Sequence, residues 1–235
     1  MENQHLFKWK HYQPEIILLT VRWYLRYNVS FRDLVEMMEE RGLSIAHTTI
    51  MRWVHQYGPE LDKRVRSHLK KTNDSWRVDE TYIKVKGQWI YLYRTVDSEG
   101  NTIEFYLSEL RDKQAAKRFF KKALAASHVS RPRVITVDKN PAYPVAIEEL
   151  KEEKQVPKDI QIRQIKYLNN IVEQDHRFIK KRVRPMLGFK SIETAASILS
   201  GVEAMHMIKK EQIDLRDQSV QTQKEFIHQL FELAS

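Results

Sequence analysis

One stretch of the chain, residues 167–182, combines a carboxylate with a basic run at helical spacing. An Asn pair at 169 and 170 can cap the start of a helix there. A metal ion at the acidic end and a polyanion along the basic run would suit such a helix. A solvated basic amphipathic helix has the same spacing, so this stretch alone leaves both interpretations open. The residues that would share one helical face are Glu173, His176, Arg177 and Lys180.

Two more acids occur in segments with the pattern of β-strands. Asp79 lies within one segment and Asp138 at the end of another, and a carboxylate in a half-buried strand is costly unless it is paired or binds a metal. Carboxylates on rigid elements suit Mg²⁺, and two such ions about 3.5–4 Å apart activate the attacking oxygen and stabilise the leaving one in phosphodiester chemistry. With Glu173, these acids predict a metal-dependent site. Taken singly, Asp79 fits a strand-edge acid equally well, and Asp138 fits a helix N-cap before Pro141.

A meander of three strands is predicted to carry Asp79. The first segment alternates in polarity, Lys86-Gly87 is typical of a hairpin turn, and the second segment is rich in aromatic and β-branched residues. The three strands and the helix after them are expected at 76–86, 89–96, 102–107 and about 112–127.

The strand that ends at Asp138 is expected beside the first strand. Residues 134–138 are apolar and β-branched and follow a helix, which is typical of a buried parallel strand. Sites in open α/β sheets form at the carboxyl ends of such strands, so adjacency would bring Asp79 and Asp138 together. A helix at 142–152, a strand near 160–165 and the Glu173 helix complete the order β-β-β-α-β-α-β-α. Further helices are predicted at 191–210 and 219–233.

The N-terminal region has the pattern of three helices. They are expected at about 15–27, from the N-cap Ser30 to Gly42, and at about 47–57 before Gly58-Pro59. A helix, a short turn and a helix with polar residues near its start are typical of a helix-turn-helix, which reads base edges in the major groove. A plain three-helix packing unit has the same outline. The third helix should bury Ile50, Trp53 and Val54 and expose the DNA-binding candidates Thr48, Thr49, Arg52 and Gln56.

The composition favours a nucleic-acid partner. The formal net charge is +9, the pI is about 9.5, and the run 63–71 adds five positive charges that could follow phosphates. A basic ribosome-associated or membrane-surface protein would look similar in bulk. The chain has no cysteine, which excludes disulfides and thiolate zinc sites, and its histidines lack zinc-ligand spacing. The absence of an apolar leader or a spanning segment predicts a cytoplasmic protein with no membrane partner.

The motifs of this chain resemble those of RNase H-like Asp-Asp-Glu transposases, and closely those of the bacterial insertion-sequence transposases of the IS-six family. The resemblance covers roughly residues 5–210, and 34 residues separate Asp138 from Glu173, a spacing that such enzymes share. One departure is Ala46, where relatives often have a polar residue, so a weak helix cap is expected there. The matching stretches include His47–Val54, Asp79–Gly87, Tyr91–Arg94, Thr136–Tyr143, Lys166–Asn170, Glu173–Arg177 and Leu187–Ser191.

The resemblance implies an enzyme with an RNase H-like α/β mixed sheet and Asp79, Asp138 and Glu173 as the catalytic, metal-binding triad. It implies two Mg²⁺ ions, replaceable by Mn²⁺, and a basic residue at Lys180. The expected function is to bind terminal inverted repeats, nick to free 3′-OH ends and join them to target DNA by replicative, cointegrate-forming transesterification. The expected partners are double-stranded DNA and at least one further copy of the chain in synapsis. An inactive DNA-binding regulator and a generic RNase H-like nuclease are the alternatives.

The predicted domains are a helix-turn-helix domain at 1–58, a basic linker at 59–73, an RNase H-like catalytic domain at 74–190 and C-terminal helices at 191–235. Other conspicuous side chains are expected to support the site or the fold without binding metal. His176 is expected to assist the site or contact phosphate, without binding metal, and Arg177 and Lys180 are expected to bind DNA. The acids expected to be structural or solvated are Glu80, Asp97 and Asp112, and the tryptophans expected in the core are Trp23, Trp53, Trp76 and Trp89.

Overall fold

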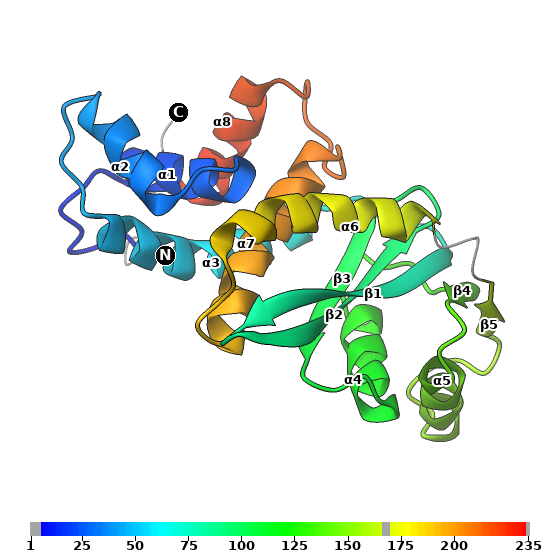
Figure 1. Cartoon of the computed structure of the whole chain (residues 1–235). Helices are drawn as coiled ribbons and strands as arrows, with labels where there is room; N and C mark the ends of the chain where they lie inside the picture. The colour runs from blue at the N-terminus through cyan, green and yellow to red at the C-terminus, as the bar shows by residue number, and fades with distance from the viewer. Residues whose placement is uncertain (1–5, 166–169, 234–235) are drawn as a thin grey trace. The chain divides into compact units, whose positions relative to one another are not determined.

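The computed structural model describes residues 6–165 and 170–233, which divide into two compact units. One unit combines Met1–Leu69 with Glu193–Ser235, and the other is Lys70–Ile192. The predicted Asn169 cap and the motif residues from Lys166 to Asn169 lie outside the described residues. Figure 1 shows the helices and strands with the labels used below.

The second unit is built on one mixed sheet of five strands in the order β3-β2-β1-β4-β5. The first three strands are antiparallel neighbours, whereas β4 runs parallel to β1 and β5 parallel to β4. This order confirms both the predicted meander and the predicted adjacency of the first and fourth strands. With its helices it has the mixed-sheet topology expected of an RNase H-like fold. The strands are β1 (Ser75–Val85), β2 (Gln88–Asp97), β3 (Thr102–Ser108), β4 (Val134–Val137) and β5 (Gln161–Gln164).

Helices cover both faces of this sheet. On one face, α4 (Lys113–Leu124) and α5 (Ala142–Glu152) bury Phe119, Phe120 and Tyr143 in one cluster with Trp76 and Val78 of β1. On the other face, α6 (Asn170–Val183) lies over β1 and β2, as Figure 1 shows. A short 3-10 helix, Arg184–Met186, ends α6.

Strand β1 buries opposite faces at its two ends. Its first half buries Trp76 and Val78, whereas its second half buries Thr81, Ile83 and Val85. Because side chains alternate between the faces of a strand, these two sets point in opposite directions. The change falls at Asp79 and Glu80, so the middle of the strand can present one acid on each face.

The first unit is helical, and its predicted caps are present. The Ser30 hydroxyl accepts a hydrogen bond from the Asp33 amide at 3.1 Å, and the Ser30 amide donates to the Asp33 carboxylate at 2.7 Å, forming a capping box. Gly42 has φ +74°, and the Leu43 amide donates back to the Met38 carbonyl at 3.0 Å, as in a Schellman C-cap. The helices are α1 (Pro14–Arg26), α2 (Phe31–Glu39), α3 (His47–Val65), α7 (Ile192–Lys209) and α8 (Val220–Leu230).

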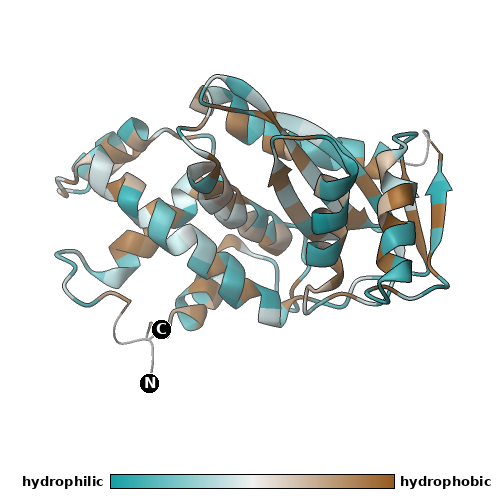
Figure 2. Ribbon diagram, turned by 90° about the horizontal axis from the view of Figure 1, so that it is seen from below, coloured by the Kyte–Doolittle hydropathy of each residue, from teal (hydrophilic) through white to brown (hydrophobic). Residues whose placement is uncertain are grey.

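Figure 2 shows hydrophobic residues interspersed with hydrophilic ones along the helices, and α1 and α2 each bury one side. Within the described ranges, no helix is both long enough and apolar enough to cross a bilayer.

The predicted end of the third helix at Gly58-Pro59 is wrong, because α3 continues to Val65. Pro59 has no amide hydrogen to donate to the carbonyl of His55, four residues earlier. That carbonyl accepts a hydrogen bond from the Ser197 hydroxyl at 2.8 Å, so a tertiary contact replaces the missing helical bond. The start of the expected linker at 59–73 is therefore helical, and its Leu61 and Val65 are buried.

At least three of the five positive charges in the run 63–71 make contacts within the protein, and one of them is Lys71, which donates to the Ser127 carbonyl at 2.8 Å. Arg64 forms an ion pair with Glu60 at 2.5 Å, and Arg66 forms one with Asp62 at 3.0 Å. Both pairs have i,i+4 spacing on one helix. They leave less of the run to follow phosphates than the sequence indicated.

Helices α3 and α7 approach closely where two glycines meet. A Cβ on Gly201 would lie 2.9 Å from the Cα of Gly58 and 2.7 Å from a methyl group of Leu25. Contacts this short force a neighbour to move, so the two helices leave no room for a side chain at Gly201.

We expect Gly201→Ala to lower the free energy of unfolding by about 1–3 kcal/mol, because the added methyl group overpacks the crossing. In a solvent-exposed helix the same change would stabilise the protein by about 0.5–1 kcal/mol. The sign of the change in the free energy of unfolding therefore shows whether overpacking or helix propensity dominates at this position. Urea denaturation followed by circular dichroism measures the effect. Ser200→Ala, one residue away and only half-buried, is the matched control and should change little. A stabilised Gly201→Ala variant would show that the helices do not pack this closely.

Candidate active site

The pairing of β1 with β4 places two predicted catalytic acids side by side. Arg77 of β1 is aligned with Thr136 of β4 in the parallel register. Two residues further along each strand direction come Asp79 and Asp138. Carboxylate oxygens of these two residues and of Glu80 lie within 4.8 Å of one another. The predicted meeting of the two aspartates is therefore present in the structure.

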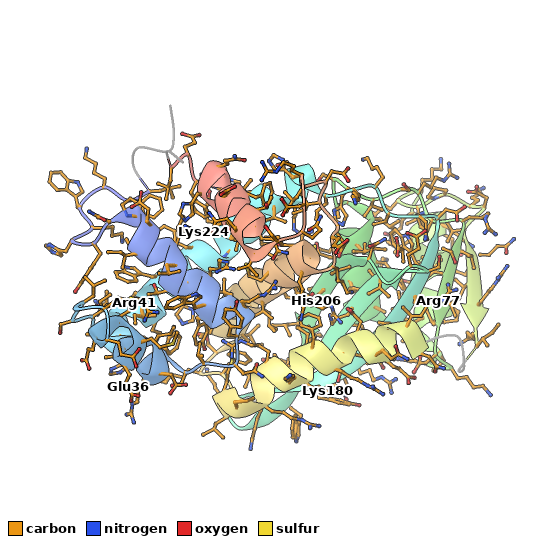
Figure 3. The ribbon with its side chains drawn as sticks, turned by 90° about the horizontal axis from the view of Figure 1, so that it is seen from above. Glu36, Arg41, Arg77, Lys180, His206 and Lys224 are labelled. Carbon is orange, nitrogen blue, oxygen red and sulfur yellow. The ribbon has the colours of Figure 1, made fainter. Side chains whose placement is uncertain are left out.

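Glu173 reaches the same region from α6 but stands outside that close cluster. It lines a pocket of 560 Å³ with Asp79 and Glu80, and it is exposed. Arg177 and Lys180 line the same pocket from the following turns of the helix, and Figure 3 labels Lys180 on α6. The structure thus brings Asp79 and Asp138 into proximity and sets Glu173 and two cations on the wall of one pocket.

Glu80, expected to be structural or solvated, is structural, but its place in this cluster of carboxylates was not predicted. Its side chain is 3% exposed, so it is not solvated, and it is held by an ion pair with Arg111 and a hydrogen bond from the Tyr143 hydroxyl. Burial raises its pKa, and the hydrogen bond from Tyr143 opposes that change. The alternation of side chains along β1 could have indicated that Glu80 is buried, because Glu80 shares a face of the strand with the buried Trp76 and Val78.

Arg111 connects two of the three carboxylates. Besides Glu80, its guanidinium contacts the Asp138 carboxylate at 3.1 Å, while the Asn140 amide donates to the other oxygen of Asp138 at 2.9 Å. Asp138 is thus oriented by a turn and a cation rather than serving as the N-cap of α5, which begins after Pro141. One guanidinium against three carboxylates leaves the cluster net negative, which favours binding of a further cation.

His176 lies behind Asp79 on the α6 side. It is 2% exposed, and its Nε2 atom is 3.2 Å from an Asp79 carboxylate oxygen. Burial lowers its pKa, and contact with Asp79 opposes the shift. The expected role in assisting the site agrees with this position. His176 also lines the same pocket as Glu173, Arg177 and Lys180, as their predicted shared helical face requires.

A buried ion pair fixes α6 on the sheet. Arg94 of β2 is fully buried, lies 2.6 Å from the Asp175 carboxylate and stacks over the Phe178 ring at 5.0 Å. Ile179 and Val183 bury the apolar side of the helix. Glu173, Arg177 and Lys180 are among the positions that remain exposed, so the orientation of the helix follows from its buried face.

Comparison with known proteins identifies the chain. Residues 73–212, more than half of the sequence, match the family model of a DDE domain. Over 204 residues the chain is 38% identical to the transposase for insertion sequence-like element IS431mec of Staphylococcus aureus, covering 87% of this chain and 88% of that protein. The chain belongs to the DDE transposase family. It is also 37% identical, over the same coverage, to the transposase for insertion sequence element IS257 in transposon Tn4003 of Staphylococcus aureus.

Solved structures similar to the transposase are more distant. The catalytic core domain of HTLV-2 integrase, solved in complex with magnesium, is 16% identical with a TM-score of 0.45, covering 67% of this chain and 98% of that one. The catalytic core domain of BIV integrase is 17% identical with a TM-score of 0.43, covering 66% and 94%. Likenesses of this degree carry no argument about individual residues or ligands.

The residues expected to contact DNA lie together on α3. Arg52 and Gln56 are exposed, Thr48 and Thr49 are half-buried, and the expected inward residues Ile50, Trp53 and Val54 are buried. The Gln56 side chain accepts a hydrogen bond from Lys10 at 3.0 Å.

The N-cap of α3 is Ala46, which makes no side-chain hydrogen bond. The departure from the family motif therefore leaves this helix start without a side-chain cap, as expected.

Some predictions for conspicuous side chains are confirmed and one is wrong. Asp97 is buried and accepts hydrogen bonds from the Asn73 and Asn101 amides, and Asp112 caps α4, so both are structural. Trp53 and Trp76 are buried, and Trp23 is half-buried beneath Arg41. Trp89, in contrast, is 66% exposed, because α4 and α5 do not cover the outer half of the β1–β2 hairpin.

We expect Arg111→Gln to lower the free energy of unfolding by about 1–3 kcal/mol, since it removes the ionic partner of the buried Glu80 carboxylate. Chemical denaturation in chelator measures the effect without metal. Arg133→Gln removes an exposed pair with Asp74 and is the control, with an expected change below about 1 kcal/mol. Equal effects of the two variants would show that the Arg111 contacts add no more than a surface ion pair.

Proposed function

We propose that this transposase nicks the ends of an insertion sequence to free 3′-OH groups and joins them to target DNA in a replicative, cointegrate-forming reaction. The observation that carries the proposal is the meeting of Asp79 and Asp138 at the carboxyl end of β4, with Glu173 on the wall of the same region. These residues are proposed as the catalytic acids. Family membership supports DNA as the substrate.

The proposed cofactor is a pair of Mg²⁺ ions, replaceable by Mn²⁺. The donor set fits, because hard carboxylate oxygens of Asp79 and Asp138 converge from two neighbouring strands, and because Arg111 leaves part of their charge uncompensated. Asp79, Asp138 and Glu173 would hold the ions. Bound there, the metal supplies activation of the attacking oxygen and stabilisation of the leaving oxygen.

The protein's own groups orient this site. His176 supports Asp79 from the α6 side, and Arg111 and the Asn140 amide fix Asp138 from the other. Arg177 and Lys180 line the pocket beyond Glu173 and are proposed to bind phosphates that neighbour the scissile one. The rigid attachment of α6 through Arg94 holds these cations in register with the acids.

Recognition of the element ends is assigned to the helix-turn-helix at 1–58 and catalysis to 74–190. Thr48, Thr49, Arg52 and Gln56 are proposed to contact base edges from α3. Synapsis of two ends favours at least two copies of the transposase in the reacting complex.

Asp79→Asn, Asp138→Asn and Glu173→Gln should each abolish nicking and joining of a DNA carrying the element ends, with end binding kept within a few fold. Each change removes a carboxylate charge and preserves size, while end binding is assigned to other residues. Gel assays of cleavage in Mg²⁺ and of binding in chelator measure the two effects. Wild-type-like cleavage by a variant would remove that residue from the triad. Wild-type protein that binds ends without cutting them would instead be a regulator, and one that cuts any duplex or hybrid would be a nuclease.

Lys180→Ala should slow strand transfer by about tenfold or more, and the slope of log affinity against log salt on a pre-cleaved end should fall by about one unit. Seven helical residues place Lys180 about 10.5 Å along α6 from Glu173 and within about 20° of the same face. Lys181, also exposed but about 100° further around, is the matched control and should show neither effect. Identical behaviour of the two variants would mean that the basic run acts only as a diffuse electrostatic surface.

Arg52→Ala should cost about 1–3 kcal/mol of end binding and reduce the preference for the end over random duplex. Competition binding with the two DNAs gives both quantities. An equal loss on both DNAs would make Arg52 a phosphate contact and not a base contact.

A further inference from the structure

The outer half of the β1–β2 hairpin presents aromatic and basic side chains on one face. In the antiparallel register Tyr82 is aligned with Tyr91 and Lys84 with Trp89. These positions share the face of β1 that carries Glu80, because they follow it at two-residue steps. The face that holds an acid of the candidate site therefore continues outward as aromatic and basic residues.

The outer half of this face is open to solvent, whereas the inner half is covered. Trp89 is 66% exposed and Tyr82 49% exposed, whereas Trp76 on the same face is fully buried. The Tyr82 and Tyr91 ring centroids are 5.1 Å apart, so the two tyrosines support each other across the strands. Exposing a large aromatic side chain forgoes the stabilisation that burial would give, and such exposure is typical of binding surfaces.

A pocket of 410 Å³ adjoins this face. Its lining includes Trp89, Lys84 and the C-terminal end of α6. Leu187 also lines it, with a side chain that is 91% exposed on a left-handed residue of φ 57°. Lys180 lines both this pocket and the one that contains Asp79 and Glu173. The two pockets thus share one lysine, and Arg184, in the short 3-10 helix after α6, adds a second cation to the outer one.

We propose that this hairpin surface (Tyr82, Lys84, Trp89, Arg184 and Leu187) binds the DNA strand that continues beyond the scissile phosphate, with a base unpaired and stacked on Trp89. The proposal rests on the proposed function and names how the same site takes its substrate. Aromatic faces interleaved with cations bind single strands by combining base stacking with phosphate contacts, without regard to sequence.

The dimensions agree with a strand leaving the acids. A β-strand rises about 3.3 Å per residue, so Tyr82 and Lys84 lie about 7 and 13 Å from Glu80 along β1. That span matches a short stretch of nucleotides next to the reacting phosphate. A fully paired duplex has no free base face inside the stack, so an exposed tryptophan here selects an opened strand.

A second copy of the chain fits the hairpin surface less well than a DNA strand does. A two-fold contact would place the same patch against itself. Lys84, Lys180 and Arg184 would then face their own counterparts, and like charges brought together across an interface are unfavourable. The phosphates of DNA have the complementary charge.

The test uses the full chain in chelator, with fluorescence anisotropy on two fluorescein-labelled DNAs of arbitrary sequence. One is a fully paired duplex, and the other is the same duplex ending in a fork with four unpaired nucleotides on each strand. Trp89→Ala should weaken binding of the forked DNA by about tenfold and leave paired DNA within about twofold, because one base stack is lost. Trp89→Phe should restore most of the forked-DNA affinity. Thermal melting checks that each variant is folded.

Trp9→Ala is the matched control, since Trp9 is an exposed tryptophan of the other compact unit, and it should leave the ratio of the two affinities unchanged. An equal loss on both DNAs, or no loss, overturns the proposal. A change of oligomeric state in Trp89→Ala, seen by light scattering, overturns it in favour of contact between copies. Because no divalent ion or element end is used, failure here is separate from failure of the end-cleavage assay, which tests the proposed function.

Discussion

The parallel pairing of β1 with β4 is the constraint on which the candidate site depends. Its register aligns Arg77 with Thr136, and this alone carries Asp79 and Asp138 to the same level of the sheet. Two carboxylates brought so close repel each other unless cations or hydrogen bonds compensate them. The surrounding structure supplies that compensation, through Arg111 and the Asn140 amide at Asp138 and through His176 beside Asp79.

The change of buried face along β1 makes these supports possible. Asp79 faces α6, whereas Glu80 faces the core of α4 and α5, so each acid is held from its own side of the sheet. The same change leaves the outer hairpin without a covering helix on one face, and Trp89 is exposed there. The location of the acids and the open aromatic surface beside them are thus two results of one strand geometry.

Most of the sheet could be predicted from the sequence, because the strands have clear alternation and distinct turns. The positions of Asp79 and Asp138 followed from strand order, and the capping box at Ser30 followed from local chemistry. What was missed depends on contacts between distant segments. Pro59 stays inside α3 because Ser197 satisfies the carbonyl that it leaves free, and the burial of Glu80 depends on Tyr143 of another helix.

Metal binding by the intact transposase tests most directly whether the register of β1 and β4 builds a divalent-metal site. Titration of Mn²⁺, followed by electron paramagnetic resonance, should show sites in the wild-type protein whose affinity falls at least about tenfold in Asp79→Asn and in Asp138→Asn. Glu148→Gln, which removes a largely exposed acid of α5, should leave binding unchanged. Equal Mn²⁺ affinity in the wild-type protein and both aspartate variants would contradict the account.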